Sequence, residues 1–535
     1  MKRIFAFAVF LLFLAGLALV NLASMKPASG AWNDLPASST SGKTADAAGV
    51  LSVDEIRRLT ARQTPAALEL FREFLSVPND ARHPDDILRM VSWLETRFGA
   101  LGFETRRLPT AGSPLLLAER RHDGAEKTVL VYLQADGQPV DPSHWQQDDP
   151  YQPVLKERDA DGNWHDLPWD RLLGEIDPDW RIFARSASDS KGPMTQFMAA
   201  IAALDDAGIT PDFNLKVIID TEEELGSPHL AAAVEEHRER LAADLLLIFD
   251  GPPHASNAPT VSFGARGIVD VTLVSYGPRV PQHSGHYGNF VPNPAQHMAR
   301  ILGSLKSIDG RVLIPGFYDG ISLDNDVREI LANVPDDEAA LRRQIGFARP
   351  DAVAATLQEA LQYPSLNIRG LSSAWVGPEA RTIIPDTATA EIDIRLVLES
   401  DPARLVRLLR THIEDLGYYV IDRAPTEAER LGKPYIVAMT HNLSYNAFRS
   451  DFDGAAGLLA RAGMRHLYGH EPILIRTMGG SIPIAPFVTT LAIPAATVPT
   501  VNIDNNQHSP NENIELQFFI KGISIIMSVL SQPLQ

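Results

Sequence analysis

VLVYLQADGQPV, residues 129–140, begins as a run that is apolar on both faces and ends in polar residues. Such a run is typical of a strand inside a parallel sheet, because helices cover both sides of that kind of sheet. Gln134 and Asp136 follow the run directly, at the predicted carboxyl end of the strand. Ligands of open α/β sheets bind beyond this end, so we expect both side chains to face a functional site.

Helix and strand patterns alternate around this stretch. Ser52 and Glu55 form a capping-box sequence, and we expect the folded part of the chain to begin there. Helical spacing of apolar residues predicts helices, and short apolar runs predict strands; the helices are 85–103, 194–208 and 227–241, and the strands are 104–109, 114–120, 128–134, 214–220 and 243–251. This alternation favours an α/β fold with a mostly parallel sheet.

A second α/β pattern starts near Ile268 and predicts a smaller inserted domain. Its expected elements are strands 268–276 and 387–397 and helices 293–305 and 401–417. We therefore expect the main domain to be built from residues 51–267 and 424–535, with residues 268–423 forming the insertion.

The N-terminal sequence predicts export. MKRIFAFAVFLLFLAGLALV (residues 1–20) places Lys2 and Arg3 ahead of a long apolar run. Residues 1–30 are thus expected to be a cleaved signal peptide or a membrane anchor, and residues 31–50 a flexible tether. The body of the protein would lie outside the cytoplasm, in a periplasm, either secreted or anchored to the inner membrane.

Composition excludes several classes of function. The chain has 535 residues and a formal net charge of -19, which argues against a nucleic-acid-binding surface. It contains no cysteine, so disulfides, thiol catalysis and Cys-ligated zinc are excluded. Any metal site must use His, Asp, Glu and neutral oxygen atoms.

Polar residues from four further segments are expected at the same edge of the sheet. Carboxylates stand at Asp189, after strand 214–220 at Glu223 and Glu224, and at the end of strand 243–251 at Asp250. His508 lies near the C-terminus. Each alone would be an ordinary turn, helix-cap or loop residue. Carboxylates that are packed together repel one another unless a cation joins them. Their convergence therefore predicts a metal site.

At this point the chain resembles a known family, the co-catalytic zinc peptidases and deacylases. These include carnosinase, nonspecific dipeptidases, carboxypeptidase G, aminoacylase and succinyl-diaminopimelate desuccinylase. The resemblance spans roughly residues 55–530 and looks closest to the dipeptidase branch. It rests on motifs in the family's order: LQADGQPVDPSHW with DDPYQPVLK, FARSASDSKGP, DTEEELGS, PQHSGHYGN with VPNP, RTIIPDTATAEIDIRLV, GGSIPI and NNQHSPNE.

The resemblance implies that the main domain is catalytic and that the insertion is a lid and dimerisation domain. Asp189 is similar to the carboxylate that bridges two metals. Glu224 and His508 are similar to further ligands of one metal, and Asp250 to a ligand of the other. Glu223 is similar to the general base.

Other matching positions imply further roles. Asp136 is similar to an acid that orients the ligand at Gln134, and His283 to a lid histidine that reaches the partner's active site in dimeric relatives. Three further residues are similar to the family's groups that hold the carboxylate and backbone of the substrate: Arg395, Gly480 and Ser481.

Gln134 departs from the family, which has a metal-binding His at this position. A glutamine oxygen is a weaker zinc ligand than imidazole. We expect this oxygen to face a metal beside Asp250, with the amide hydrogens bonded to Asp136; the alternative is that Gln134 only hydrogen-bonds the neighbouring loop. Either arrangement weakens the metal site at Asp250. The loop at Ala184–Ser186 and Ser190 also differ from the family's pattern.

The sequence therefore predicts a metal-dependent hydrolase of peptide or amide bonds, acting on dipeptides, small peptides or N-acyl amino acids. We expect one or two zinc ions, with manganese or cobalt as alternatives, and a homodimer. One competing hypothesis is a peptide-binding protein that has lost catalysis; it explains poorly why a general base would be kept beside metal ligands. The other is a serine hydrolase, but the chain has no G-x-S-x-G motif.

Overall fold

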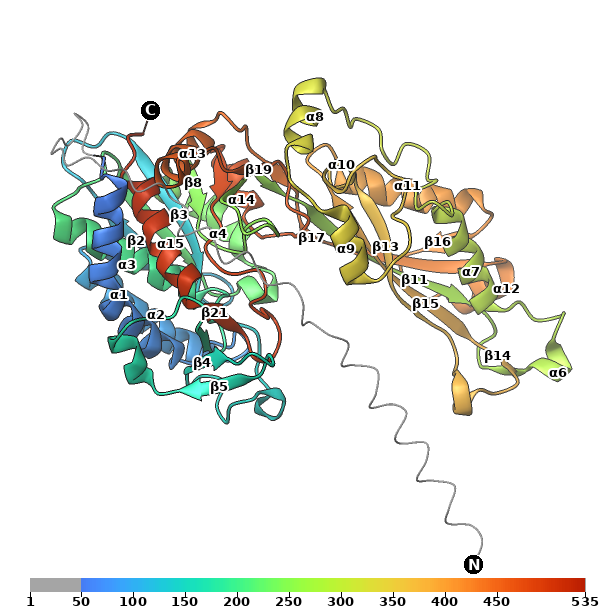
Figure 1. Ribbon diagram of the computed structural model, residues 1–535. Coiled ribbons are helices and arrows are strands. Elements are labelled where there is room, and N and C mark those ends of the chain that lie inside the picture. The colour runs from blue at the N-terminus through green and yellow to red at the C-terminus, as the bar shows by residue number, and fades with distance from the viewer. Residues whose placement is uncertain (1–49, 535) are drawn as a thin grey trace, which may run out of the picture.

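The computed structural model describes residues 50–534 (Figure 1). The expected signal peptide or anchor (1–30) and almost all of the expected tether (31–50) lie outside these residues. Within residues 50–534, no helix is both long enough and apolar enough to span a membrane.

An eight-stranded sheet forms the centre of the main domain, in the order β1-β2-β7-β3-β8-β20-β9-β19. The four strands in its middle, β7, β3, β8 and β20, run parallel. This confirms the expected mostly parallel α/β fold. In sheet order, the bounds are β1 Glu104–Leu108, β2 Leu115–Arg120, β7 Asn214–Asp220, β3 Thr128–Gln134, β8 Leu245–Ile248, β20 Ala495–Thr497, β9 Thr260–Ser262 and β19 Ile473–Ile475.

Strand β3 is buried on both faces, as its sequence predicts. Val131 and Leu133 point into the hydrophobic core on one side of the sheet, whereas Leu130 and Tyr132 point into the core on the other. Neighbouring side chains of a strand point to opposite faces, so a strand between two helical layers needs apolar residues at every position. The apolar run ends at Gln134, where the strand reaches the edge of the sheet.

Two layers of helices cover the sheet (Figure 1). The capping box of Ser52 and Glu55 starts the first helix, as expected. The larger layer contains α1 (Val53–Leu75), α2 (Pro84–Ala100), α3 (Lys191–Ala207), α13 (Ala455–Tyr468) and α15 (Leu516–Leu530). The smaller layer contains α4 (Leu230–Glu236), α5 (Arg238–Leu241) and α14 (Ala485–Thr490). The sequence predicted α4 and α5 as one helix, but the helical conformation breaks at His237.

A small four-stranded sheet joins the C-terminal part of the chain to the loop that precedes α3. Its order is β21-β6-β4-β5, with bounds β21 Asn513–Glu515, β6 Arg181–Phe183, β4 Val154–Arg158 and β5 Trp164–Leu167. In the antiparallel pair of β21 and β6, Asn513 lies opposite Phe183. The pairing therefore brings the segment before β21, which carries His508, next to the segment after β6, which carries Asp189.

The inserted domain has a five-stranded sheet in the order β13-β15-β11-β17-β16. Helices α7 and α11 pack on one face of it. The strands are β11 Gly267–Tyr276, β13 Ser365–Ser372, β15 Thr387–Leu396, β16 Tyr419–Ile421 and β17 Ile436–Tyr445. The helices are α6 Ser284–Tyr287, α7 Pro294–Leu305, α8 Asn325–Ala332, α9 Glu338–Ile345, α10 Leu357–Ala360, α11 Pro402–Asp415 and α12 Glu427–Gly432. The short strands β12 (Gln282–His283) and β14 (Ile383–Ile384) form a separate pair.

The end of the inserted domain lies later than the sequence suggested. We expected the chain to return to the main domain after residue 423, but β17 belongs to the inserted sheet and pairs with β11 along most of its length. The return occurs at β18 (Phe448–Arg449), which pairs with β10 (Gly264–Ala265) at the point where the chain leaves the main domain. The residues of a strand do not by themselves reveal which of two sheets it will join.

The contact between α13 and α15 depends on Gly463. A Cβ atom at this position would lie 2.5 Å from Val529 Cα, and the Ser528 hydroxyl donates to the Gly463 carbonyl at 2.8 Å. The two backbones therefore approach too closely for any side chain at Gly463.

Gly463→Ala should accordingly lower the free energy of unfolding by about 1–3 kcal/mol, because the helices must separate. Gly99→Ala is the matched control: Gly99 lies in α2 with open space around it, so alanine should stabilise its helix by up to about 1 kcal/mol. Urea denaturation of both variants measures the difference. An equal effect of the two substitutions would contradict the close packing of α13 on α15.

Candidate metal centre

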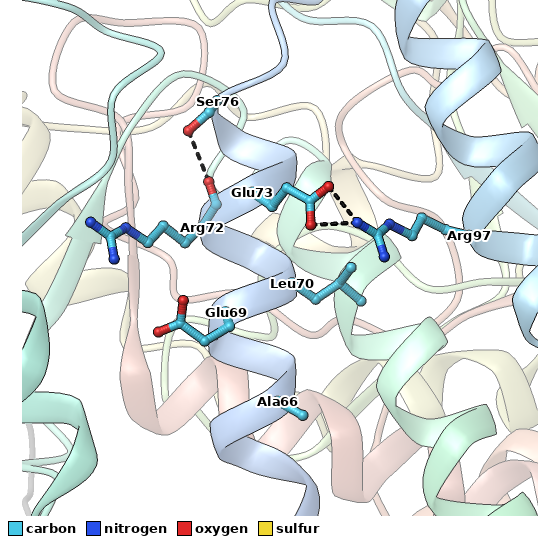
Figure 2. A pocket seen from close by; sticks show the side chains of 7 residues that line it. All are labelled: Ala66, Glu69, Leu70, Arg72, Glu73, Ser76 and Arg97. Carbon is cyan, nitrogen blue, oxygen red and sulfur yellow. Dashed lines mark hydrogen bonds and ion pairs between the residues drawn. The ribbon is translucent and has the colours of Figure 1, made fainter.

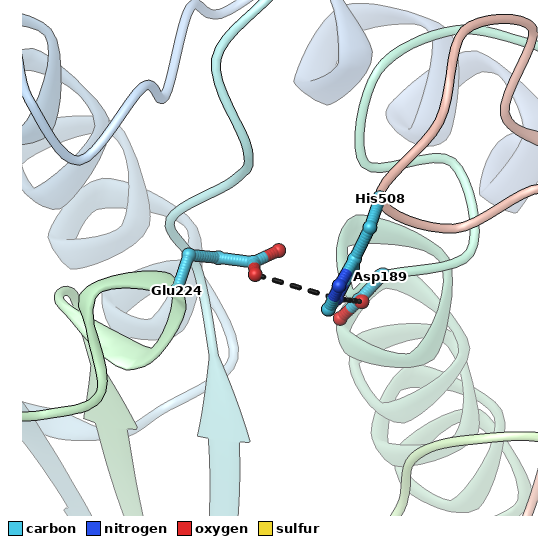
Figure 3. Close-up of side chains that lie close together, drawn as sticks. All are labelled: Asp189, Glu224 and His508. Carbon is cyan, nitrogen blue, oxygen red and sulfur yellow. Dashed lines mark hydrogen bonds and ion pairs between the residues drawn. The ribbon is translucent and has the colours of Figure 1, made fainter. Parts of the chain in front are cut away.

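Asp189, Glu224 and His508 meet beyond the carboxyl end of the central sheet, as the sequence predicts. Asp189 Oδ2 lies 3.0 Å from His508 Nε2, and the same nitrogen lies 3.4 Å from Glu224 Oε2. Figure 3 shows Glu224 pointing from one side toward Asp189 and His508 on the other. One ligand atom from each residue lies within 4.8 Å of the other two, and no other such group occurs within residues 50–534. Two carboxylates and an imidazole are a common donor set for zinc and similar ions.

Glu512 fixes the loop that carries Asp189, a role that we did not predict. Its carboxylate accepts hydrogen bonds from the backbone N–H groups of Ser186, Ser188 and Asp189, at 2.9–3.0 Å. It also forms a buried ion pair of 2.7 Å with Arg185. Glu512 closes the motif NNQHSPNE, so the sequence contained a signal, but an isolated Glu in a loop does not identify its partners.

Asp136 fixes the other side of the site. Its two carboxylate oxygens accept hydrogen bonds from the backbone N–H groups of Glu223, at 3.0 Å, and Glu224, at 2.9 Å. We expected Asp136 to hold the amide of Gln134, and this expectation is wrong: Asp136 instead orients the short 3₁₀ helix Glu223–Leu225. One buried carboxylate thus positions both the candidate base and a candidate ligand.

The loop of Glu223 requires a glycine at its end. Gly226 has a φ of +85°, which favours glycine, and a Cβ atom there would lie 2.8 Å from the Tyr445 hydroxyl. Tyr445 is the last residue of β17 in the inserted domain. The inserted domain therefore contacts the loop that carries the candidate base.

Gln134 lies at the site but contacts a residue that we did not expect. Its Nε2 donates to Asp189 Oδ1 at 2.5 Å, and its side chain is buried. The amide nitrogen must face this oxygen, because a carboxylate only accepts hydrogen bonds and would repel the amide oxygen. The Gln134 amide thus bonds to Asp189 in place of the predicted bond to Asp136, whose oxygens accept the backbone N–H groups of Glu223 and Glu224.

Asp250 lies on the same side of Asp189 as Gln134. The Ser190 hydroxyl donates to Asp250 Oδ1 at 2.8 Å and lies 3.3 Å from Asp189 Oδ1. Asp250 does not join the group of three potential ligands formed by Asp189, Glu224 and His508. The sequence correctly predicted its location, but not the hydroxyl between the two carboxylates.

Burial of several carboxylates together makes the site electrostatically unfavourable without a cation. Burial and then the charge of Asp189 raise the pKa of Glu224 to about 8, that of Asp250 to about 7, and that of Glu223 well above its usual value. The hydrogen bond with Asp189 raises the pKa of His508 to about 9. A divalent cation would relieve this repulsion, so the residues present fit a metal ion.

The candidate substrate-binding residues lie between the two domains. Arg395 on β15 donates to the Ser481 hydroxyl at 2.9 Å, which brings together two of the predicted residues. Gly480 lines a cavity of about 680 Å³. Other walls of this cavity are residues 252–254 and 503–507 and, from the inserted domain, Gln358 and Leu361. It therefore extends from the loops that carry Asp250 and His508 to the inserted domain.

His283 is not part of the metal centre of its own chain. It is exposed at β12, directly before α6, and α6 lies at the end of the inserted domain that points away from the main domain (Figure 1). Its Nδ1 accepts a hydrogen bond from the backbone N–H of Gly285 at 3.0 Å.

A second hollow of about 540 Å³ lies along the outer face of α1 (Figure 2). Glu73 and Arg97 form an ion pair across it, and Glu69 and Arg72 add charges of both signs. None of its lining residues belongs to the metal centre.

The raised pKa values predict how metal removal affects stability. In the metal-free protein the pKa of Glu224 is about 8, compared with an ordinary value of 4.5. The folded state therefore keeps a proton that the unfolded state releases, and stability is lost as pH rises from 4.5 to about 8. The raised pKa of His508 acts in the same direction.

Chelator-treated protein should thus show a melting temperature that falls over this pH interval, more steeply than that of the metal-loaded protein. Glu224→Gln is the control, because it removes one titrating group and should flatten the decline. A melting temperature of the metal-free protein that rises with pH across the interval would contradict the charge distribution described here.

Comparison with known proteins agrees with this geometry. The family model for "Peptidase family M20/M25/M40" matches residues 152–532. A Beta-Ala-His dipeptidase from Homo sapiens is 25% identical over 494 residues, covering 88% of this chain and 90% of that protein. A Cys-Gly metallodipeptidase from Schizosaccharomyces pombe is 26% identical over 426 residues, covering 78% of this chain and 82% of the relative.

Among solved structures, an M20 family metallo-carboxypeptidase from Sulfolobus solfataricus superimposes with a TM-score of 0.71 and 27% identity, covering 87% of this chain and 98% of that chain. The matched family model spans well over half of this chain and includes Asp189, Glu223, Glu224, Asp250 and His508. Sequence, fold and site geometry thus lead to one conclusion: the chain belongs to peptidase family M20/M25/M40.

Proposed function

We propose that the protein is a metal-dependent dipeptidase. The observation that carries the proposal is the cluster of Asp189, Glu224 and His508, with the half-buried Glu223 beside it. Two curated relatives that align over most of this chain are named as dipeptidases, which supports dipeptides as the substrate class. N-acyl amino acids are a second substrate class, because hydrolysis of their amide bond requires the same chemistry.

Asp189, Glu224 and His508 would hold the metal ion. When bound, a divalent ion supplies a Lewis acid that polarises the scissile carbonyl and lowers the pKa of water. Glu223 takes a proton from the attacking water as its oxygen bonds to the carbonyl carbon, and then gives that proton to the departing nitrogen as the C–N bond breaks. Arg395 and Ser481 are suited to hold the substrate's terminal carboxylate, since both offer hydrogen-bond donors near the cavity.

Zinc is the ion that we propose, because two carboxylates and an imidazole without thiolates suit it well. Manganese and cobalt accept the same donors and are the alternatives. A peptide-binding protein without catalysis is disfavoured, because a half-buried carboxylate such as Glu223, placed among other carboxylates, costs stability and serves no purpose in binding alone.

We further propose a homodimer in which His283 serves the active site of the partner subunit. The support is its position: it is exposed at the tip of the inserted domain and far from the metal centre of its own chain. An imidazole delivered from a second chain could stabilise the oxyanion that forms during hydrolysis.

We also propose that the protein acts outside the cytoplasm. The support is the sequence of residues 1–20, with Lys2 and Arg3 ahead of an apolar run. Whether this segment is cleaved or retained as an inner-membrane anchor decides between a secreted and a tethered enzyme. N-terminal sequencing of the mature protein and fractionation of the cells test both possibilities.

Glu223→Gln should lower the turnover of dipeptides by at least about 10²–10⁴-fold while leaving the metal content unchanged, because Glu223 moves a proton and is not a required ligand. Glu222→Gln is the matched control; it replaces the adjacent carboxylate and should retain activity. Hydrolysis rates and elemental analysis of both variants test this. Loss of metal from Glu223→Gln would instead make Glu223 a ligand.

His283→Ala should lower turnover by about 10²–10³-fold without lowering the metal content, because it removes one donor to the oxyanion. Co-expression of His283→Ala with Glu223→Gln tests the action in trans. Each mixed dimer would then contain one site with an intact Glu223 and an intact partner histidine. Activity should reappear in the mixture, whereas two inactive sites would place His283 within its own subunit or outside the mechanism.

A further inference from the structure

The two oxygens of the Asp189 carboxylate face different surroundings. Oδ2 faces His508 at 3.0 Å and lies 3.4 Å from the amide nitrogen of Gln507, on the side of Glu224. Oδ1 faces the amide nitrogen of Gln134 at 2.5 Å and the hydroxyl of Ser190 at 3.3 Å. The first side offers the electron pairs of His508 and Glu224 to a cation, with the Gln507 amide at a longer distance. The groups that contact Oδ1 on the second side are both hydrogen-bond donors.

Gln134 turns a hydrogen-bond donor, and not a metal ligand, toward Asp189. Its Nε2 and Asp189 Oδ1 are 2.5 Å apart, in direct hydrogen-bond contact. An amide N–H₂ group has no lone pair to offer to a metal, so Gln134 in this orientation acts on the carboxylate directly.

Ser190 donates a hydrogen bond to Asp250, as Gln134 does to Asp189. The Ser190 hydroxyl carries one proton, and the shorter contact, 2.8 Å, directs it to Asp250 Oδ1. Asp250 also accepts a hydrogen bond from the backbone N–H of Gly251. Each of the two carboxylates on this side thus has a neutral donor, where a second metal ion would otherwise supply positive charge.

We propose that the enzyme binds a single metal ion, at Asp189, Glu224 and His508, and that hydrogen bonds from Gln134 and Ser190 take the place of a second ion between Asp189 and Asp250. Gln134 is then a positioning residue that keeps Asp189 oriented as a ligand of the one ion, and Ser190 provides the hydrogen-bond donor for Asp250. The inference rests on the proposed metal-dependent function, and it differs from the two-metal arrangement implied by the family resemblance.

Metal content after dialysis tests the proposal without an activity assay. Wild-type protein loaded with Zn²⁺ should retain one ion per chain, and Gln134→His should retain two, because an imidazole nitrogen replaces the amide. The double substitution of Gln134→His with Ser190→Asp adds a further carboxylate and should also retain two. Asp250→Asn should still retain one ion, whereas His508→Ala should lose it.

Electron paramagnetic resonance of the Mn²⁺-loaded protein provides a second measurement. Wild type should give the signal of an isolated Mn²⁺ ion, and Gln134→His that of two ions coupled by a shared carboxylate. Two tightly held ions in the wild type, or loss of the single ion in Asp250→Asn, would overturn the proposal. A single ion in both the Gln134→His variant and the double variant would also overturn the proposal.

These outcomes are separable from failure of the proposed function. A wild-type protein that holds one ion but hydrolyses no dipeptide or acyl-amino acid would refute the function and leave the single-ion inference standing. A wild-type protein that hydrolyses dipeptides with two bound ions would support the function and refute the single-ion inference.

Discussion

Repulsion among buried carboxylates is the constraint on which the rest of this structure depends. Asp136, Asp189, Glu223 and Glu224 converge where the parallel strands end, and burial raises the pKa of three of them. Such a group can persist only when each carboxylate is given a donor or a cation. The surrounding loops are built to provide these partners.

The protein meets this constraint in different ways at different carboxylates. Asp136 and Glu512 accept backbone N–H groups, and they hold the loops of Glu223 and Asp189 in place. Asp250 accepts a serine hydroxyl. Asp189 and Glu224 face His508, and in the described part of the chain (50–534) this is the one group of three potential ligands whose lone pairs are directed at one point. The same repulsion that would destabilise a metal-free site makes this point favourable for a cation.

Contacts near the candidate metal centre connect the inserted domain to the main domain. The chain crosses between the domains twice, where β10 pairs with β18, and Tyr445 on β17 touches the loop of Glu223 at Gly226. Arg395 reaches across to Ser481. These contacts couple the position of the inserted domain to the geometry of Glu223, the candidate base, and of the cavity. A change in domain orientation would therefore move both the candidate base and one wall of the cavity.

The sequence alone determined the layered α/β fold, the order of the main elements and the identity of the residues at the strand ends. It could do so because a strand buried on both faces must be apolar throughout and because parallel strands place their carboxyl ends together. Only the tertiary structure decided that β17 joins the inserted sheet, that Asp136 holds the backbone of Glu223 and Glu224, and that Gln134 bonds to Asp189. Hydrogen-bond partners depend on distances of a few tenths of an ångström between segments far apart in the chain, and residue types and their spacing carry no information on such distances.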